Sequence, residues 1–242
     1  MNIKKWKRKK EKYKMRANTN NLKLKELFSD YFLTKEFKEI ISNIEDGKKF
    51  EKKLLEIFKN TEYVQLSAKN FAKNENFKEV KKAINKIYST SGSIKLNKQI
   101  KFKESKFFVY QPFNSQSSPD FLFYNFGKFF PLEAKFTSKK IKSPVWNSGL
   151  PKTHFNYIFG SKGKKDLTFF TGKDFIDKKQ YDQVIKLVNK KRKELEKEGK
   201  KINSEFSLYL RPMYNQKTNF WKYKLRETNE KKLIQLIKEF DS

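Results

Sequence analysis

Residues 117–136 have the sequence SSPDFLFYNFGKFFPLEAKF, and this stretch decides the interpretation of the chain. Runs rich in Phe, Leu and Tyr flank a turn signal at residues 125–127, which predicts a β-hairpin. Asp120 begins the first strand, and Glu133 and Lys135 lie on the second. Because residues two apart on a strand share a face, Glu133 and Lys135 are expected to point the same way. The hairpin would bring Asp120 beside Glu133.

These three polar residues suit metal-assisted phosphate chemistry. Two carboxylates are suitable ligands for a hard cation such as Mg²⁺, which also keeps several of its waters. A bound metal lowers the pKa of a water molecule and stabilises charge on a phosphate. The Lys135 ammonium would orient the attacking water or offset the charge of the transition state. Asp120, Glu133 and Lys135 are therefore the predicted catalytic residues.

The arrangement resembles the PD-(D/E)xK nuclease superfamily, and most of all its type II restriction endonucleases. The matching residues are Pro119-Asp120 and Glu133-Ala134-Lys135. The resemblance implies a restriction-endonuclease-like core in which Asp120 and Glu133 bind Mg²⁺. It also implies that the backbone carbonyl of Ala134 adds a metal ligand and that Lys135 serves the water nucleophile.

The resemblance further implies a carboxylate on an early helix that packs beside the site. Glu51 occupies the expected position, flanking the apolar face of its predicted helix, whereas Glu56 is a poorer candidate. The alternative interpretation is a surface hairpin with coincidental charges, in which Glu133 and Lys135 form an exposed ion pair of little energetic value. Glu51 would then be a solvated helix residue.

The surroundings of the motif give it specificity, because an acidic residue two positions before a lysine recurs along so lysine-rich a chain. Pro119-Asp120 is the only Pro-Asp pair, and Glu133 lies in an apolar, strand-like segment. The chain has a single histidine, His154, and no phosphate-binding glycine loop. Multi-histidine metal sites and ATP-driven translocation are thus not expected.

The remaining pattern predicts one α/β domain, residues 1–242, with a mixed central β-sheet flanked by helices. Helical spacing covers residues 21–44, 48–59, 76–88, 178–198 and about 229–240. Short segments rich in Phe, Tyr, Ile and Val predict strands at residues 106–110, 121–124, 128–136, 155–159, 167–170, 205–210 and 220–225. No repeat or linker divides the chain.

The net charge of +30 predicts a polyanionic partner. Lys and Arg number 57 against 27 Asp and Glu, which exceeds what AT-rich codon bias requires. Most of the basic residues are Lys rather than Arg, the usual reader of guanine, so the charge suits contact with the phosphate backbone. Salt is expected to weaken binding steeply. An anionic membrane surface or an acidic protein is the alternative partner.

Composition also limits the class of protein. Apolar residues make up 36% of the chain and aromatic residues 16%, which is enough for a core despite the charge. The absence of cysteine excludes disulfides and thiolate zinc sites. No signal-peptide pattern and no apolar run of membrane-spanning length is present, so a soluble, cytoplasmic protein that does not engage a membrane is expected.

Two segments are candidates for DNA contact. Residues 1–16 form a basic head, which is either a DNA-contacting arm or a solvated tail. The loop of residues 137–156 follows the catalytic strand and is either a DNA-contacting loop or a polar surface loop. The lysine-rich helix around residues 186–193 is a phosphate contact or a solvated face. The candidate DNA-binding residues of the loop are Lys139, Lys140, Lys142, Trp146, Asn147, Ser148, Lys152, Thr153, His154 and Asn156.

The function expected from these features is that of a type II site-specific deoxyribonuclease, which hydrolyses phosphodiester bonds of double-stranded DNA with Mg²⁺. A homodimer is expected, so that both strands are cut. The resemblance also implies a cognate DNA methyltransferase that acts in the same system without being a stable subunit. The alternatives are a junction-resolving or repair nuclease of the same fold and a non-catalytic, basic nucleic-acid-binding protein.

Overall fold

A seven-stranded mixed sheet organises the part of the chain that the computed structural model describes. The described residues are 22–85, 94–95, 102–115, 117–146, 150–202, 205, 214 and 217–242. Six strands lie in the order β1-β3-β4-β5-β6-β7, and β2 pairs with the beginning of β5. The strands are β1 (Val64–Leu66), β2 (Ile94–Lys95), β3 (Lys106–Tyr110), β4 (Phe121–Asn125), β5 (Lys128–Thr137), β6 (Asn156–Ser161) and β7 (Asp166–Thr171).

The hairpin of β4 and β5 forms the centre of this sheet and confirms the predicted hairpin. β4 runs antiparallel to both β3 and β5, and β6 runs antiparallel to β7. The β1–β3 and β5–β6 pairs are parallel. The hairpin turn consists of Phe126 and Gly127, which both have positive φ angles, and Gly127 adopts this conformation without a Cβ penalty.

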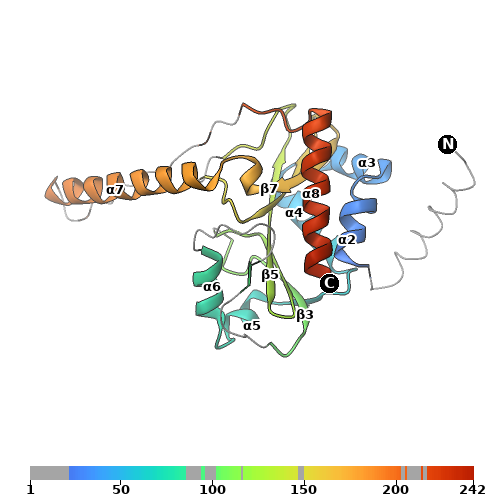
Figure 1. Cartoon of the computed structure of the whole chain (residues 1–242), viewed down its shortest axis with the longest axis horizontal. Helices are drawn as coiled ribbons and strands as arrows, with labels where there is room; N and C mark the ends of the chain where they lie inside the picture. Colours follow the sequence, from blue (N-terminus) through green and yellow to red (C-terminus); the bar gives the residue numbers. More distant parts are fainter. Residues whose placement is uncertain are drawn as a thin grey trace, which may run out of the picture.

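Helices cover both faces of the sheet (Figure 1). α2 (Leu24–Glu26) continues into a short π-helix (Leu27–Tyr31), and α3 (Lys35–Asn43) and α4 (Gly47–Phe58) follow. Next come α5 (Ala68–Ala72) and α6 (Phe77–Asn85). After the strands come a 3-10 turn (Gly172–Asp174), α7 (Lys178–Ile202) and α8 (Tyr223–Asp241).

One face of the sheet packs against α2, α3, α4 and α8. Alternate residues of the hairpin strands, Phe121, Phe123, Phe130 and Leu132, join apolar residues of these helices in a first buried cluster. Phe58 of α4 makes edge-to-face contacts with Phe121 and Phe123, with ring centroids 5.0 and 5.1 Å apart. These contacts fix α4 against the hairpin.

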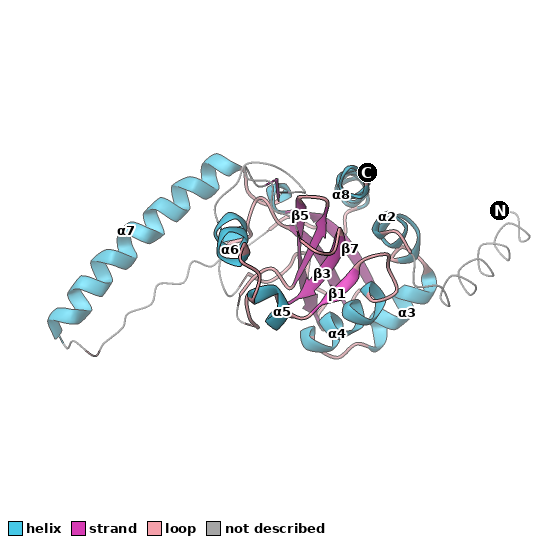
Figure 2. Ribbon diagram, turned by 90° about the horizontal axis from the view of Figure 1, so that it is seen from below, coloured by secondary structure: helices cyan, strands magenta, loops and turns pink. Residues whose placement is uncertain are grey.

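The other face of the sheet packs against α5, α6 and the base of α7 (Figure 2). Leu122, Tyr124 and Phe129 of the hairpin lie here in a second buried cluster, together with Phe71 of α5 and Tyr181 of α7. One sheet therefore separates two helical layers, each with its own apolar core. The predicted fold class, α/β with a mixed central sheet flanked by helices, is confirmed.

Most of the predicted elements are also confirmed. The strands expected at 106–110, 121–124, 128–136, 155–159 and 167–170 correspond to β3, β4, β5, β6 and β7. The helices expected at 48–59 and 178–198 correspond to α4 and α7. The helical run expected at 21–44 is interrupted at Thr34, whose side chain accepts a hydrogen bond from the Phe37 N–H and caps α3.

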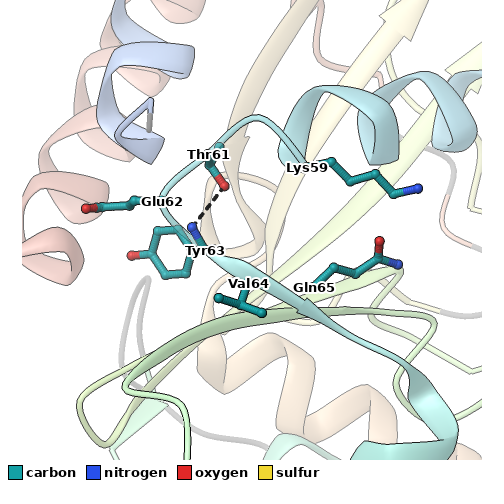
Figure 3. Close-up of a pocket in the computed structure, with 6 residues that line it drawn as sticks. All are labelled: Lys59, Thr61, Glu62, Tyr63, Val64 and Gln65. Atoms are coloured by element: carbon teal, nitrogen blue, oxygen red, sulfur yellow. Dashed lines mark hydrogen bonds between the residues drawn. The ribbon is translucent and has the colours of Figure 1, made fainter. Parts of the chain in front are cut away.

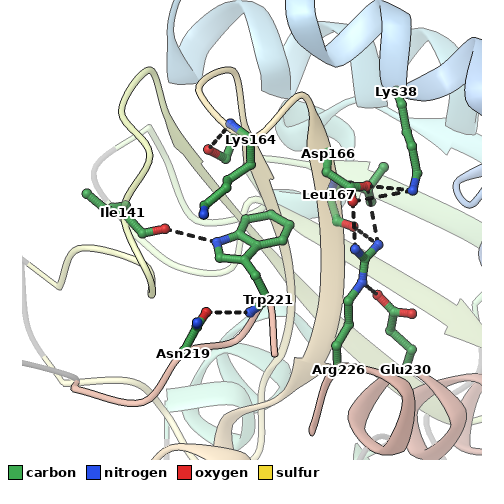
Figure 4. A network of polar contacts seen from close by, with 10 residues as sticks. Lys38, Ile141, Lys164, Asp166, Leu167, Asn219, Trp221, Arg226 and Glu230 are labelled. Atoms are coloured by element: carbon green, nitrogen blue, oxygen red, sulfur yellow. Dashed lines mark hydrogen bonds and ion pairs between the residues drawn. The ribbon is translucent and has the colours of Figure 1, made fainter. Parts of the chain in front are cut away.

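The strand predicted at residues 220–225 is wrong, because α8 begins at Tyr223. Arg226, in the first turn of α8, donates hydrogen bonds to both carboxylate oxygens of Asp166 at 2.6 and 3.2 Å (Figure 4). It also bonds Glu230 at 2.7 Å. A contact four residues along the chain forms on a helix and not on a strand, so this ionic network accounts for the helical start.

Some expectations fall outside the described residues. They concern the basic head of residues 1–16, the end of the helix expected at 76–88, and nearly all of the strand expected at 205–210. Within the described part of the chain, no helix has both the length and the apolar character needed to cross a bilayer.

Candidate active site

The strand neighbours of β5 change at the point where β4 begins, and we call this point the fork. β4 pairs with β5 only as far as Phe121 opposite Leu132, whereas β6 accompanies β5 from Leu132 to Thr137. Among the described residues, the second half of β5 thus has a strand on one side and an open edge on the other. Asp120 lies at this fork immediately before β4, and Glu133 follows Leu132 on the half of β5 that has the open edge.

Asp120 contacts the open edge through its side chain. Its Oδ2 accepts a hydrogen bond of 2.8 Å from the backbone N–H of Ala134. Because a strand residue points its N–H and its C=O to the same side, the Ala134 carbonyl also faces the fork. The backbone carbonyl of Asp120 accepts a hydrogen bond of 2.7 Å from Gln111, which ties the end of β3 to the same place. The expected meeting of Asp120 with the second strand is confirmed.

Glu133 and Lys135 project together toward the second cluster. Nζ of Lys135 lies 2.8 Å from Oε1 of Glu133 and 5.7 Å from the centre of the Trp146 ring. Leu132 and Ala134 lie in the first cluster, so the predicted alternation is confirmed. The Glu133 side chain is only 10% exposed and that of Lys135 23%. The alternative of an exposed surface ion pair is therefore wrong.

One carboxylate oxygen at the fork has no hydrogen-bond partner among the described residues. This atom is Oε2 of Glu133, which is buried. A buried acceptor without a partner is uncommon in proteins, and a bound ion or water molecule would satisfy it.

The oxygen atoms at the fork fit a small divalent cation. Asp120, Glu133 and the Ala134 carbonyl are ligands of the type that Mg²⁺ accepts. In the described part of the chain, no three His, Asp or Glu side chains come close enough to hold a metal ion between them. A metal ion at the fork would thus have two carboxylates and a carbonyl from the protein, and water in its remaining positions.

Glu51 approaches the fork from the first face of the sheet, on α4. Its Oε2 accepts hydrogen bonds from the Tyr110 hydroxyl at 2.9 Å and from the Gln111 side chain at 3.4 Å. The pKa of Glu51 is raised, chiefly by burial, and the charge of Glu133 adds to the shift while the two hydrogen bonds oppose it. Glu51 is therefore not a solvated helix residue, and it lies within electrostatic range of Glu133.

The fork concentrates negative charge. Burial raises the pKa of Asp120 well above its usual value, and the carboxylates of Glu133 and Glu51 raise it further. Burial alone would lower the pKa of Lys135, but the same three carboxylates outweigh burial and raise it. Lys135 is thus held charged, and a divalent cation would relieve the remaining repulsion among the carboxylates.

Lys152 is a second lysine of this region and one of the expected DNA-binding residues. Burial lowers its pKa, with the charge of Glu133 opposing the shift and that of Lys135 adding to it. Its Nζ lies 4.5 Å from the centre of the Phe155 ring. Its backbone N–H donates to the Tyr157 hydroxyl at 2.8 Å, which fixes this part of the loop. Lys152 therefore belongs to the electrostatic surroundings of the fork.

The loop of residues 137–156 has an exposed part and a buried part. Lys139, Lys140 and Lys142 are exposed, as DNA contact requires. By contrast, Trp146, Thr153, His154 and Asn156 are at most 5% exposed. This burial corrects their prediction as DNA-binding residues, because a side chain inside the fold offers no surface to a duplex. Asn147 and Ser148 lie outside the described residues.

Internal contacts explain the buried part of the loop. Nε2 of His154 lies 2.9 Å from the Ile84 carbonyl oxygen, and burial lowers the pKa of His154 to about 4. The ring is therefore neutral at pH 7. The Asn156 amide donates to the Pro131 carbonyl at 3.0 Å and joins β6 to β5. Polar side chains that form contacts inside the fold have the same sequence signal as side chains that bind DNA.

Sequence reasoning does not single out Tyr110 and Gln111, which hold Glu51 in place. Tyr110 ends β3, and Gln111 has a positive φ of 49°. In the sequence they appear only as two polar residues at the end of an apolar strand. That signal is too common to identify a site without the structure.

A separate hollow of about 240 Å³ lies between α4 and β1 (Figure 3). The Thr61 hydroxyl accepts a hydrogen bond from the Tyr63 N–H, and the Tyr63 hydroxyl donates to Asp241 at 2.7 Å. Glu62 accepts a hydrogen bond from Lys106 at 2.9 Å. These polar groups already have partners, and the hollow is not part of the fork. Its lining residues are Lys59, Thr61, Glu62, Tyr63, Val64 and Gln65.

Comparison with known proteins yields no family: no family model, no curated protein and no solved structure matches the chain. A functional interpretation of the fork therefore rests on its own residues and geometry.

Proposed function

We propose that this protein is a Mg²⁺-dependent endonuclease that hydrolyses phosphodiester bonds of double-stranded DNA on a restriction-endonuclease-like core. The observation that carries the proposal is the meeting of Asp120, Glu133 and Lys135 at an open sheet edge. The chain as a whole is strongly basic, with a net charge of +30. Carboxylates repel a polyanion unless a cation lies between them, so this combination favours a metal-dependent nuclease over a simple binding protein.

Asp120, Glu133 and the Ala134 carbonyl would hold the metal ion. When bound, the ion supplies a water molecule of lowered pKa and stabilises charge on the phosphate. The partnerless Oε2 of Glu133 and the raised pKa of Asp120 support this assignment, because both are unfavourable without a cation. The binding of the ion would offset both.

Lys135 would place a fixed positive charge beside the reacting phosphate. Its pKa is raised by the surrounding carboxylates, so the side chain is a hydrogen-bond donor and not a base at neutral pH. Held at 2.8 Å from Glu133, the ammonium orients a water molecule or offsets charge on the phosphate oxygens. Glu51 is a positioning residue, because its charge interacts with those of Asp120, Glu133 and Lys135.

Duplex DNA is the substrate that the charge distribution favours. Lys139, Lys140 and Lys142 follow β5 directly and are exposed, so a phosphate backbone beside the fork would meet positive charge. Cutting both strands requires two sites, and we therefore expect a homodimer. A site-specific enzyme of this kind would act with a separate DNA methyltransferase that protects the host's own DNA.

A digest of long, sequence-diverse duplex DNA tests this proposal. Reactions contain Mg²⁺ or EDTA, and a parallel series uses the Asp120→Asn variant to exclude a contaminating nuclease. We expect discrete fragments with Mg²⁺ and wild-type protein only, and end mapping would then give the recognition sequence. A smear that requires Mg²⁺ and Asp120 would instead favour the junction-resolving or repair nuclease. Retained DNA binding with no cutting would favour the non-catalytic binding protein.

A further inference from the structure

α7 projects from the body of the protein as a long helix (Figure 1 and Figure 2). It contains 25 residues, which corresponds to a length of about 37 Å at 1.5 Å per residue. Tyr181 and Ile185 pack into the second cluster at its base. Beyond Val188 nearly every residue is exposed or partly exposed. Burial of apolar surface therefore accounts for the base of α7 and not for its outer part.

Exposed lysines form a continuous stripe along one side of α7. Their spacings of three, four and seven residues place them within a sector of about 80° around the helix axis. In the described part of the chain, none of them forms an ion pair. The stripe consists of Lys179, Lys186, Lys190, Lys193, Lys197 and Lys200.

The acidic residues of α7 leave most of this stripe uncompensated. Glu194 and Glu196 flank the stripe on its two sides. Glu194 and Glu198 bond Lys191 and Lys201, each at 2.8 Å. Asp182, near the base, is the acidic residue that falls within the stripe's own sector. Mutual repulsion of lysines one turn apart is unfavourable for an isolated helix. The arrangement therefore points to a polyanion that neutralises the stripe.

The opposite side of α7 differs in character. Val184, Val188 and Leu195 lie there, about half a turn from the lysines. A helix that is merely solvated would have charges of both signs all round, whereas six lysines that form no ion pair within the described part of the chain gather on one side of α7. The stripe is therefore not a simple consequence of the lysine-rich composition.

The base of α7 lies on the same side of the sheet as the residues of the fork. Trp146 and Phe175 share the second cluster with Tyr181. The Trp146 ring lies 4.8 Å from the Phe175 ring and 5.7 Å from Nζ of Lys135. α7 therefore extends from the face of the sheet toward which Glu133 and Lys135 project.

We propose that α7 is an arm that grips the phosphate backbone of the duplex whose cleavage is proposed at the fork. This inference rests on the proposed function for the identity of its partner. A lysine at each turn gives one charge per roughly 5.4 Å, and the arm's length is close to the 34–36 Å of one turn of B-DNA. Lysine is a flexible point charge, which suits phosphate contact without base recognition.

The test compares two variants that lose the same charge. The stripe variant replaces Lys186, Lys190, Lys193 and Lys197 by Gln. The control variant replaces four exposed lysines of the layer on the first face by Gln, which leaves the total charge equal. These are Lys23, Lys35, Lys224 and Lys238, for which the structure shows no side-chain ion pair in its described part. Circular dichroism verifies that both variants keep their helix content.

Binding to a 30-base-pair duplex is measured in EDTA over a range of salt concentrations, so that the result does not depend on cleavage. Each lost phosphate contact reduces the slope of log K against log salt by about 0.9. We expect the slope of the stripe variant to fall by about 3 to 4 and that of the control variant by less than about 1. Equal slopes for the two variants would contradict the proposed contact between α7 and the phosphate backbone, even if the wild-type protein cuts DNA. A stripe-dependent slope without any cleavage by wild-type protein would support the arm and count against the proposed nuclease.

Discussion

At the scale of single residues, Asp120 is a buried carboxyl group whose ionisation is disfavoured by the fold. Burial raises its pKa, and Glu133 and Glu51 raise it further. An acidic group with a raised folded-state pKa contributes stability below its unfolded pKa of about 3.9, and this stability is lost as the pH rises through the folded pKa. Without metal, the contribution of Asp120 to the stability of the fold therefore falls as the pH rises.

The Asp120→Asn variant should accordingly be more stable than the wild type in EDTA at about pH 7.5. Asn keeps an oxygen for the Ala134 N–H and removes the charge. The gain should shrink as the pH falls through the raised pKa of Asp120, because the wild-type carboxyl becomes protonated there. Scanning calorimetry from about pH 4 to 8 measures this, with about 1 kcal/mol corresponding to roughly 2–4 °C. If the wild type is more stable than the variant at about pH 7.5 in EDTA, the claim that the fold disfavours ionisation of Asp120 is contradicted.

Glu51 should matter less than the residues that face the metal ion. Glu51→Gln keeps the hydrogen bonds to Tyr110 and Gln111 in part but removes the charge, so we expect cleavage to slow by roughly 10- to 100-fold. Glu56→Gln on the same helix serves as the control, because Glu56 is exposed and pairs with Lys53. Single-turnover cleavage rates decide the matter. Equal rates for the two variants would reduce Glu51 to a structural residue.

Several of these residues were open to prediction from the sequence, because strand alternation fixes their direction. Glu133 and Lys135 share a face once the segment is a strand, and the turn at Gly127 sets the position of Asp120. Trp146, His154 and Asn156 show the limit of such reasoning. Their burial depends on contacts with α6, β5 and β6 that are distant in sequence, so polar character alone could not separate them from surface residues.

At the scale of elements, the ionic network of Arg226 holds α8 against β7. Arg226 bonds Asp166 and Glu230, and their side chains are 17% or less exposed. Arg226→Ala would leave Glu230 without its cation and Asp166 with Lys38 alone, and we expect a loss of about 3 kcal/mol in the free energy of unfolding. Lys231→Ala is the matched control, because its pair with Glu227 is exposed to solvent and should contribute little to stability.

Urea unfolding of both variants measures this difference. Similar losses for Arg226→Ala and Lys231→Ala would show that the network does not hold α8 in place. The same network explains the incorrect strand prediction at residues 220–225. Apolar and aromatic residues there resemble a strand, but the helix depends on Arg226 meeting Asp166, which lies far away in sequence.

Strands and helices with strong periodicity were predictable, and short elements were not. β3 to β7 and α4 bury several side chains each in a regular pattern. β1 has three residues and α5 has five, too few for a pattern to emerge. Both are stabilised by tertiary contacts, β1 by pairing with β3 and α5 through Phe71 in the second cluster.

At the scale of the whole molecule, the net charge is positive but the carboxylates at the fork are a local concentration of negative charge. A net charge of +30 attracts a polyanion, while the fork gathers three carboxylates at one edge of the sheet. Composition predicted the first feature directly. The second depended on how far β4 extends along β5, which the sequence does not specify. A nuclease requires both, namely a basic surface that holds DNA and an acidic centre that holds a metal ion.

The most direct test of the central claim uses the Glu133→Gln variant, which keeps the shape of the side chain and removes its charge. Cleavage of duplex DNA in saturating Mg²⁺ and DNA binding in EDTA are measured in parallel for wild type and variant. We predict that wild-type protein cuts the DNA and that the variant loses at least about 10³-fold in rate, comparable with the loss of a main catalytic interaction. Its affinity for DNA should stay within about threefold. Cleavage by the variant at the wild-type rate would contradict the assignment of the fork as the active site.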